Sequence, residues 1–139
     1  MTSEAERLEC VGRLLLTRWG IVFRDLAVRE PLAPPWRELV RHYRRLEARG
    51  EVRGGRFLAG VGGEQFALPA SVEVARTIRR LRPSGLRIEV AGVDPLNLTG
   101  VVTPGPRVPA VLGQKVVYLD GIPETVEVAV TVPDSALAS

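Results

Sequence analysis

Residues 35–49 read PWRELVRHYRRLEAR and carry the clearest helical pattern in the chain. Apolar side chains recur every three or four positions, which places them on one side of a helix that turns about 100° per residue. These residues are Trp36, Leu39, Val40, Tyr43 and Leu46. The opposite side carries Arg37, Arg41, Arg44, Arg45 and Ala48. Gly50 follows as a stop signal. The stretch therefore predicts an amphipathic helix with an arginine face.

The segment after this helix predicts a β-hairpin. Residues 51–57 and 65–68 have the composition of two short strands, and glycines at 60, 62 and 63 permit a tight tip between them. Arg53 and Arg56 flank Gly54-Gly55, where a backbone without side chains allows a close approach to phosphate. The alternative is an ordinary hairpin whose arginines face solvent.

Two further helices are predicted before residue 35. Residues 4–19 carry an apolar stripe made of Leu8, Val11, Leu15 and Trp19. Residues 22–30 predict a shorter helix, with Phe23, Leu26 and Ala27 on its inner face. Prolines at 31, 34 and 35 then force a turn before the third helix. Three such helices followed by a hairpin predict a winged helix, which is a helix-turn-helix unit with a β-hairpin wing.

A fourth helix and a boundary follow the hairpin. Residues 72–81 predict a helix with an inner stripe of Val72, Ala75, Ile78 and Leu81. Its outward residues, with the one after it, are Arg76, Arg79, Arg80 and Arg82. Residues 83–85, Pro-Ser-Gly, form the clearest internal boundary.

Beyond this boundary the pattern changes to β. Leu86, Ile88 and Val90 alternate with charged residues, and residues 101–103 are a candidate second strand. Residues 115–119, the pair Asp120-Gly121 and residues 122–132 predict a hairpin. The expected fold class is α+β, with a winged-helix domain and extra C-terminal helix over residues 1–82 and a small β-rich module over residues 83–139.

Charge is unevenly distributed along the chain. Residues 1–82 hold 16 arginines and no lysine against 10 acidic residues, a net charge of +6, whereas residues 83–139 hold three basic and six acidic residues, a net of −3. Genomic base composition explains the preference for arginine over lysine, but not the crowding of arginines in one half. The first half is therefore expected to attract a polyanion.

Several function classes lose support from composition. Cys10 is the single cysteine and His42 the single histidine, which argues against an internal disulfide, a metal site and a Ser-His-Asp triad. Cys10 is expected to be a small buried residue, and His42 a surface residue on the charged helix face. No apolar run approaches the roughly 20 residues that span a bilayer. The polar, acidic start resembles no secretory signal, so we expect a cytoplasmic protein without a membrane partner.

The arginine-faced helix and the wing form the main candidate site. The planar guanidinium fork can make two parallel hydrogen bonds to phosphate and can also read guanine edges. In a helix-turn-helix unit the third helix enters the groove. The candidate nucleic-acid-binding residues are Arg37, Arg41, Arg44, Arg45, Arg53 and Arg56. The competing interpretation is a solvated face, with Glu38 and Glu47 neutralising part of the row.

Asp94 carries a second hypothesis. It starts the run DPLNL over residues 94–98, and an aspartate before proline is typical of a turn in which the side chain bonds local backbone. The functional alternative is a carboxylate at a nucleic-acid pocket, acting as a general base or stabilising an oxocarbenium ion.

Three stretches resemble a known family. They are GIVFRDLAVRE over residues 20–30, PPWRELVRHYRRLEARGEVRGGRFLAGVGGEQFALP over residues 34–69 and DPLNLTGVVTPGPRVPA over residues 94–110. Together they are similar to the C-terminal region of Lhr-type proteins, the large helicase-related ATP-dependent DNA helicases of superfamily 2. Members of the family move 3′ to 5′ on single-stranded DNA, unwind RNA–DNA hybrids and act in bacterial DNA repair.

The resemblance implies an accessory role for this chain. Neither glycine cluster fits a Walker A sequence and there is no DExH box, so the chain by itself is not expected to be catalytic or to need a cofactor. ATP and Mg²⁺ would serve an upstream motor. The implied partners are single-stranded or duplex DNA, RNA–DNA hybrid and the upstream helicase domains.

Two other roles remain open from the same resemblance. Some family members are associated with uracil-DNA glycosylase chemistry, for which Asp94 would be the candidate carboxylate. Others oligomerise through this region, so a scaffold that binds further copies of the chain is a third possibility.

Overall fold

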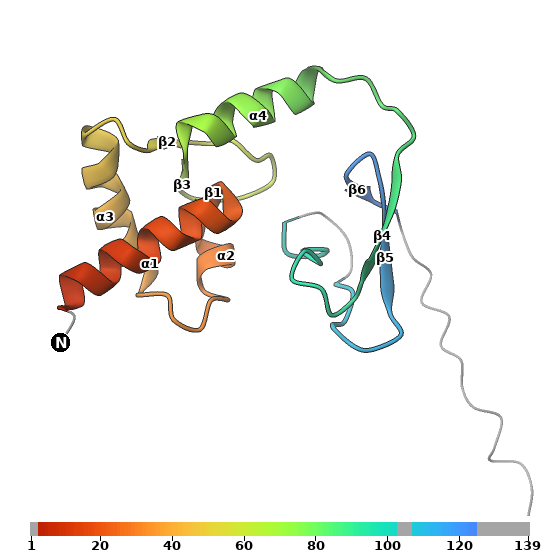
Figure 1. The fold of residues 1–139 in the computed structure, drawn as a ribbon, viewed down its shortest axis with the longest axis horizontal. Helices are drawn as coiled ribbons and strands as arrows, with labels where there is room; N and C mark the ends of the chain where they lie inside the picture. The colour runs from red at the N-terminus through yellow and green to blue at the C-terminus, as the bar shows by residue number, and fades with distance from the viewer. Residues whose placement is uncertain (1–2, 103–106, 125–139) are drawn as a thin grey trace, which may run out of the picture. The chain divides into compact units, whose positions relative to one another are not determined.

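The computed structural model describes residues 3–102 and 107–124. These residues fall into two compact units, the first ending at Arg82 and the second beginning at Pro83. Figure 1 shows the first unit as a group of helices around a small sheet, and the second as a β structure.

The first unit begins with the helix that the apolar stripe predicts. Helix α1 spans Glu4–Trp19, and its N-terminus is closed by a capping box in which Ser3 and Glu6 bond each other's backbone N–H groups. At its C-terminus Gly20 adopts a φ of 73°, a left-handed value that glycine reaches without strain. The prediction for residues 4–19 is confirmed.

The predicted helix over residues 22–30 is wrong at both ends, because residues 22–23 belong to a strand and residues 28–30 lie in a turn and a bend. Ile21–Phe23 form strand β1, and only Arg24–Ala27 form helix α2. The strand pairs antiparallel with the second wing strand, so its hydrogen bonds come from residues far along the sequence, and this contact overrides the local helical pattern. The burial prediction holds, because Phe23, Leu26 and Ala27 are buried.

The third helix and the wing follow the sequence prediction closely. Helix α3 spans Trp36–Ala48, strand β2 spans Arg53–Gly55 and strand β3 spans Gln65–Ala67. The strands pair antiparallel, and the sheet has the order β1-β3-β2. The element order of α1, β1, α2, α3, β2 and β3 is that of a winged helix, as the α+β prediction stated.

The core of this unit lies between α1, α3 and the sheet. Its members come from all of these elements and from α2: Leu15, Leu16, Val22, Ala27, Leu39, Tyr43, Leu46, Val52 and Phe66. The buried Tyr43 hydroxyl donates a hydrogen bond of 2.9 Å to the Gly12 carbonyl, which ties α3 to α1. The inner face of α3 is therefore fixed, and its outer face is left to solvent.

Helix α4 spans Pro69–Arg80 and extends the winged helix. Only Val72 of its expected inner stripe is fully buried, whereas Ile78 is 61% exposed and Leu81 is 67% exposed. The prediction of a stacked, buried stripe is therefore wrong for the second half of the helix. The pattern marks a helix with an apolar face, but it does not say how much of that face the rest of the domain covers.

The second unit is an antiparallel sheet of strands β4 (Arg87–Ala91), β5 (Lys115–Leu119) and β6 (Ile122–Pro123) in that order. The predicted hairpin turn is confirmed, since Asp120 and Gly121 have φ of 50° and 81° and connect β5 to β6. The expected strand over 101–103 is wrong, because Val101 and Val102 lie in a turn whose N–H groups bond the Leu98 carbonyl. Residue 103 and residues 125–132 of the expected strand lie outside the described residues.

Candidate nucleic-acid interface

The arginine face of α3 stands over a closed core. Leu39, Tyr43 and Leu46 on the inner side are 0% exposed, whereas Arg37, Arg41 and Arg45 on the outer side are exposed. Within the part of the chain that the structure describes, none of these three guanidinium groups forms an ion pair. They are therefore free to bind an anion.

Arg44 behaves differently from its neighbours. Its guanidinium bonds Glu47 at 2.8 Å and also Glu64, and lies 5.4 Å from the centre of the Phe66 ring. The pKa of Arg44 is raised, first by its hydrogen bond to Glu47 and to a smaller extent by its hydrogen bond to Glu64. Arg44, one of the predicted contact residues, is thus paired with two carboxylates and links α3 to the wing, and its contact with nucleic acid stays a prediction.

Glu47 completes this fastening. Its Oε1 accepts a hydrogen bond of 3.0 Å from the Gly54 N–H, and the hydrogen bond from Arg44 lowers the pKa of Glu47. A Cβ at position 54 would lie 2.6 Å from the same carboxylate oxygen, so glycine allows the close approach of β2 to α3. The sequence interpretation treated Glu47 only as a neutralising charge.

The wing has an internal clamp that sequence reasoning missed. Gln65 is 0% exposed, and its side-chain oxygen accepts hydrogen bonds from the N–H groups of Phe57 and Leu58. Its amide nitrogen donates to the carbonyls of Leu58 and Val61. A single polar residue thereby fixes the loop of the wing. The available signal was a glutamine in an apolar strand directly after a glycine-rich loop.

The two predicted wing arginines are both open to solvent. Arg53 and Arg56 are exposed, and neither forms an ion pair among the described residues. Arg56 lines a groove of about 360 Å³ whose other members are Arg44, Gly54, Gly55, Gly63, Glu64, Gln65 and Phe66. Of the predicted helix and wing residues, the structure brings Arg44 and Arg56 together at this groove, whereas Arg37, Arg41, Arg45 and Arg53 do not line it.

Two residue predictions are corrected by the structure. His42 is buried, with 5% of its surface exposed, because it packs against α1 where Gly12 leaves room for its ring. Cys10 is exposed, because it lies on the side of α1 that faces away from the core. Among the described residues no group of three or more His, Cys, Asp or Glu side chains is placed to hold a metal ion.

Asp94 forms the turn that the first of its two interpretations described. Its Oδ1 accepts a hydrogen bond of 2.8 Å from the Leu96 N–H, and Asn97 donates to the carbonyls of Gly92 and Val108 beside it. The role of Asp94 in catalysis stays a prediction.

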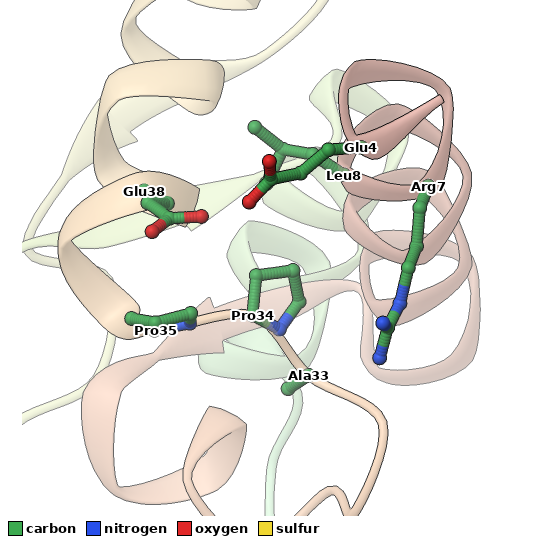
Figure 2. A pocket seen from close by; sticks show the side chains of 7 residues that line it. All are labelled: Glu4, Arg7, Leu8, Ala33, Pro34, Pro35 and Glu38. Atoms are coloured by element: carbon green, nitrogen blue, oxygen red, sulfur yellow. The ribbon is translucent and has the colours of Figure 1, made fainter. Parts of the chain in front are cut away.

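A pocket of about 250 Å³ lies between the starts of α1 and α3. Two carboxylates line it, those of Glu4 and Glu38, together with one guanidinium group, that of Arg7. Figure 2 shows the carboxylates of Glu4 and Glu38 pointing toward one another across Pro34, while Arg7 runs alongside. Facing carboxylates repel an anion. The two carboxylates therefore make this pocket less favourable for an anion than the arginine face of α3, although Arg7 also lines it.

The comparisons with known proteins agree with this architecture. A family model described as "Large helicase-related protein, winged-helix domain" matches residues 1–86. The chain is also 27% identical over 117 residues to a protein of Escherichia coli (strain K12) named "Lhr helicase/uracil glycosylase". This match covers 79% of the chain but only 7% of that relative's length. No helix among the described residues has the length and apolarity needed to span a membrane. With a winged helix over the matched residues, the chain belongs to the family of Large helicase-related protein winged-helix domains.

Proposed function

We propose that this chain is a nucleic-acid-binding accessory module of a helicase, which contacts the phosphate backbone through the arginine face of α3 and the wing. One observation carries the proposal. Arg37, Arg41 and Arg45 project from one surface of a helix whose opposite side packs into the core, and no carboxylate among the described residues pairs with them. Contacts of such groups to phosphate do not depend on the base sequence.

The motor would belong to other domains of the same protein. The E. coli relative is named a helicase, and the chain corresponds to a small share of its length. ATP and Mg²⁺ would act in those domains, and the present chain would hold DNA in the cytoplasm for them. Single-stranded DNA, duplex DNA and RNA–DNA hybrid are the three substrates to compare, because phosphate contacts alone do not distinguish them.

A charge-removal experiment tests this function. We expect Arg37→Ala/Arg41→Ala/Arg45→Ala to bind all three nucleic acids more weakly, because three phosphate contacts are lost. In titrations at several salt concentrations, the slope of log K against log [salt] should become shallower by about 3. Circular dichroism checks that the triple variant retains its helices.

The matched control removes three other exposed arginines. Arg7, Arg29 and Arg107 lie off α3 and off the wing, and none of them forms an ion pair among the described residues. Their triple alanine variant loses the same charge and should keep most of the affinity. Equal binding by wild type and the α3 variant would show that α3 is not the contact. A defined oligomer in light scattering without any DNA binding would favour the scaffold role.

A further inference from the structure

A second arginine-lined groove lies between the wing and α4, and it shares only Arg56 with the predicted site. It has a volume of about 210 Å³, and we call it the wing–α4 groove. Its lining residues are Arg56, Phe57, Val72, Ala75, Arg76 and Arg79. Three of these residues are arginines and none is acidic, which is the reverse of the pocket that Glu4 and Glu38 line.

The groove has rigid walls. On a helix that turns about 100° per residue, the four lining residues of α4 fall within one narrow face. Val72, on that face, is 5% exposed and anchors the start of α4. Phe57 forms the opposite wall, and its backbone N–H is held by the buried side chain of Gln65. The start of α4 and the wing residue Phe57 are therefore both held in place beside the groove.

Most of the cationic groups at this groove are free. Arg56 and Arg79 form no ion pair within the described residues, and Arg80 and Arg82 follow directly along the same arm of the chain. Arg76 pairs with Glu73 one turn away, and both partners are more than half exposed. An exposed pair of this kind contributes little free energy, so Arg76 can exchange Glu73 for a phosphate at low cost.

Arg56 connects the two grooves. It lines the wing–α4 groove with Arg76 and Arg79, and it also lines the groove that contains Arg44 at the junction of α3 and the wing. A nucleic-acid strand that runs from the α3 face across the wing would therefore meet Arg56 before it reaches α4. Figure 1 shows the same succession, in which the wing strands β2 and β3 lie between α3 and α4.

We infer that the wing–α4 groove binds the phosphodiester backbone of nucleic acid, and that Arg56 and Arg79 carry this second contact. The inference rests on the proposed function, because it extends the same nucleic acid beyond α3. Guanidinium groups suit this ligand, since each presents two parallel donors to phosphate oxygens. Contacts to phosphate carry no sequence information, so we expect this contact to be independent of sequence.

The test removes the two unpaired arginines of the groove. We expect Arg56→Ala/Arg79→Ala to weaken binding to single-stranded and duplex oligonucleotides and to reduce the salt slope by about 2. The double control Arg7→Ala/Arg107→Ala loses the same charge elsewhere and should keep the slope. Arg56→Lys/Arg79→Lys should retain most of the slope, because the positive charges remain.

The two proposals fail separately in this design. Loss of slope in the α3 variant but not in the groove variant would overturn the wing–α4 inference and leave the proposed function standing. Loss in the groove variant alone would support the groove and refute the α3 contact, provided that Arg79→Ala, which leaves the wing residue Arg56 in place, also lowers the slope. Loss in the lysine variant equal to that in the alanine variant would indicate disturbed packing, which overturns the electrostatic explanation.

Two further experiments distinguish nucleic acid from inorganic phosphate and from phospholipid as the ligand of the groove. Side-chain Nε–H signals of Arg56 and Arg79 should shift in NMR spectra on adding oligonucleotide, at concentrations where inorganic phosphate leaves them unchanged. A shift with inorganic phosphate alone would identify a free-anion site and overturn the inference. So would a groove variant that loses binding to anionic phospholipid vesicles while it keeps its affinity for DNA.

Discussion

The imidazole of His42 is enclosed at the contact of α1 and α3. A methyl group at Gly12 would lie 2.8 Å from its Cδ2, and its Nε2 has no hydrogen-bond partner among the described residues. Burial lowers the pKa of His42, and the charge of Arg45 lowers it further. Glu9 acts in the opposite direction, whereas Arg13 and Arg49 act with Arg45. A charged ring therefore does not suit this site.

This arrangement predicts a pH dependence of stability near neutrality. The unfolded chain binds a proton on His42 near its ordinary pKa of about 6.5, while the folded chain binds it only at lower pH. The contribution of the neutral, buried ring to the free energy of unfolding is therefore complete above about pH 6.5. It is lost as the pH falls toward the folded pKa, by at most about 1.4 kcal/mol per pH unit. Urea denaturation of wild type and His42→Gln between about pH 7.5 and 5.5 measures it. Parallel curves for the two proteins would refute the role of His42.

Individual side chains show where sequence reasoning stops. The helical pattern of residues 35–49 correctly gave the direction of the arginines and the burial of Tyr43. It did not show that Arg44 is held by Glu64, because that partner arrives on the wing, 20 residues further on. It also placed His42 on the surface, since an angle on a wheel does not reveal that a glycine on another helix makes room for a ring.

Whole elements were predictable where local pattern and tertiary contact agree. Helix α1, helix α3 and the wing hairpin carry their own signals in capping residues, periodicity and glycines. Strand β1 and the exposed half of α4 do not, since the strand depends on pairing with β3 and the exposure depends on what covers the helix. The Asp120-Gly121 turn was predictable because a two-residue hairpin turn needs positive φ at both central positions, and few residue types other than glycine, asparagine and aspartate adopt it.

Asp120 also fastens the start of the second unit, which suggests a test at this scale. Its carboxylate accepts hydrogen bonds from the N–H groups of Ser84, Gly85 and Leu86 and from the Ser84 hydroxyl, and these bonds lower its pKa. Asp120→Asn should preserve the turn, because asparagine tolerates a positive φ. It should also speed amide hydrogen exchange at residues 84–86, because the amide group replaces one acceptor with a donor.

Exchange in the first unit is the internal control for this variant. The Gly20 amide, which donates to the Leu16 carbonyl, should exchange at the same rate in both proteins. In wild type the protection at 84–86 is full above the ordinary aspartate pKa and is lost as the pH falls through the lower folded value. Unchanged protection in Asp120→Asn would mean that other contacts hold this segment.

On the scale of the whole chain, charge and fold divide at the same place. The net charge of +6 lies in residues 1–82 and the net of −3 lies beyond them, and the structure has its two compact units on either side of this boundary. The winged helix therefore carries the whole excess of positive charge. The composition of the chain pointed to a polyanion partner, whereas the distribution of free and paired arginines emerged only from the structure.

This division predicts that the winged helix binds nucleic acid without the β unit. A fragment of residues 1–86, the span that the family model matches, keeps the net charge of +6 and the whole core of the first unit. We expect it to unfold cooperatively and to bind at least as tightly as the full chain at low salt, because the acidic unit no longer repels the polyanion. Residues 83–139 serve as the control and should not bind. A folded fragment that binds much more weakly than the full chain would instead place part of the contact on the second unit.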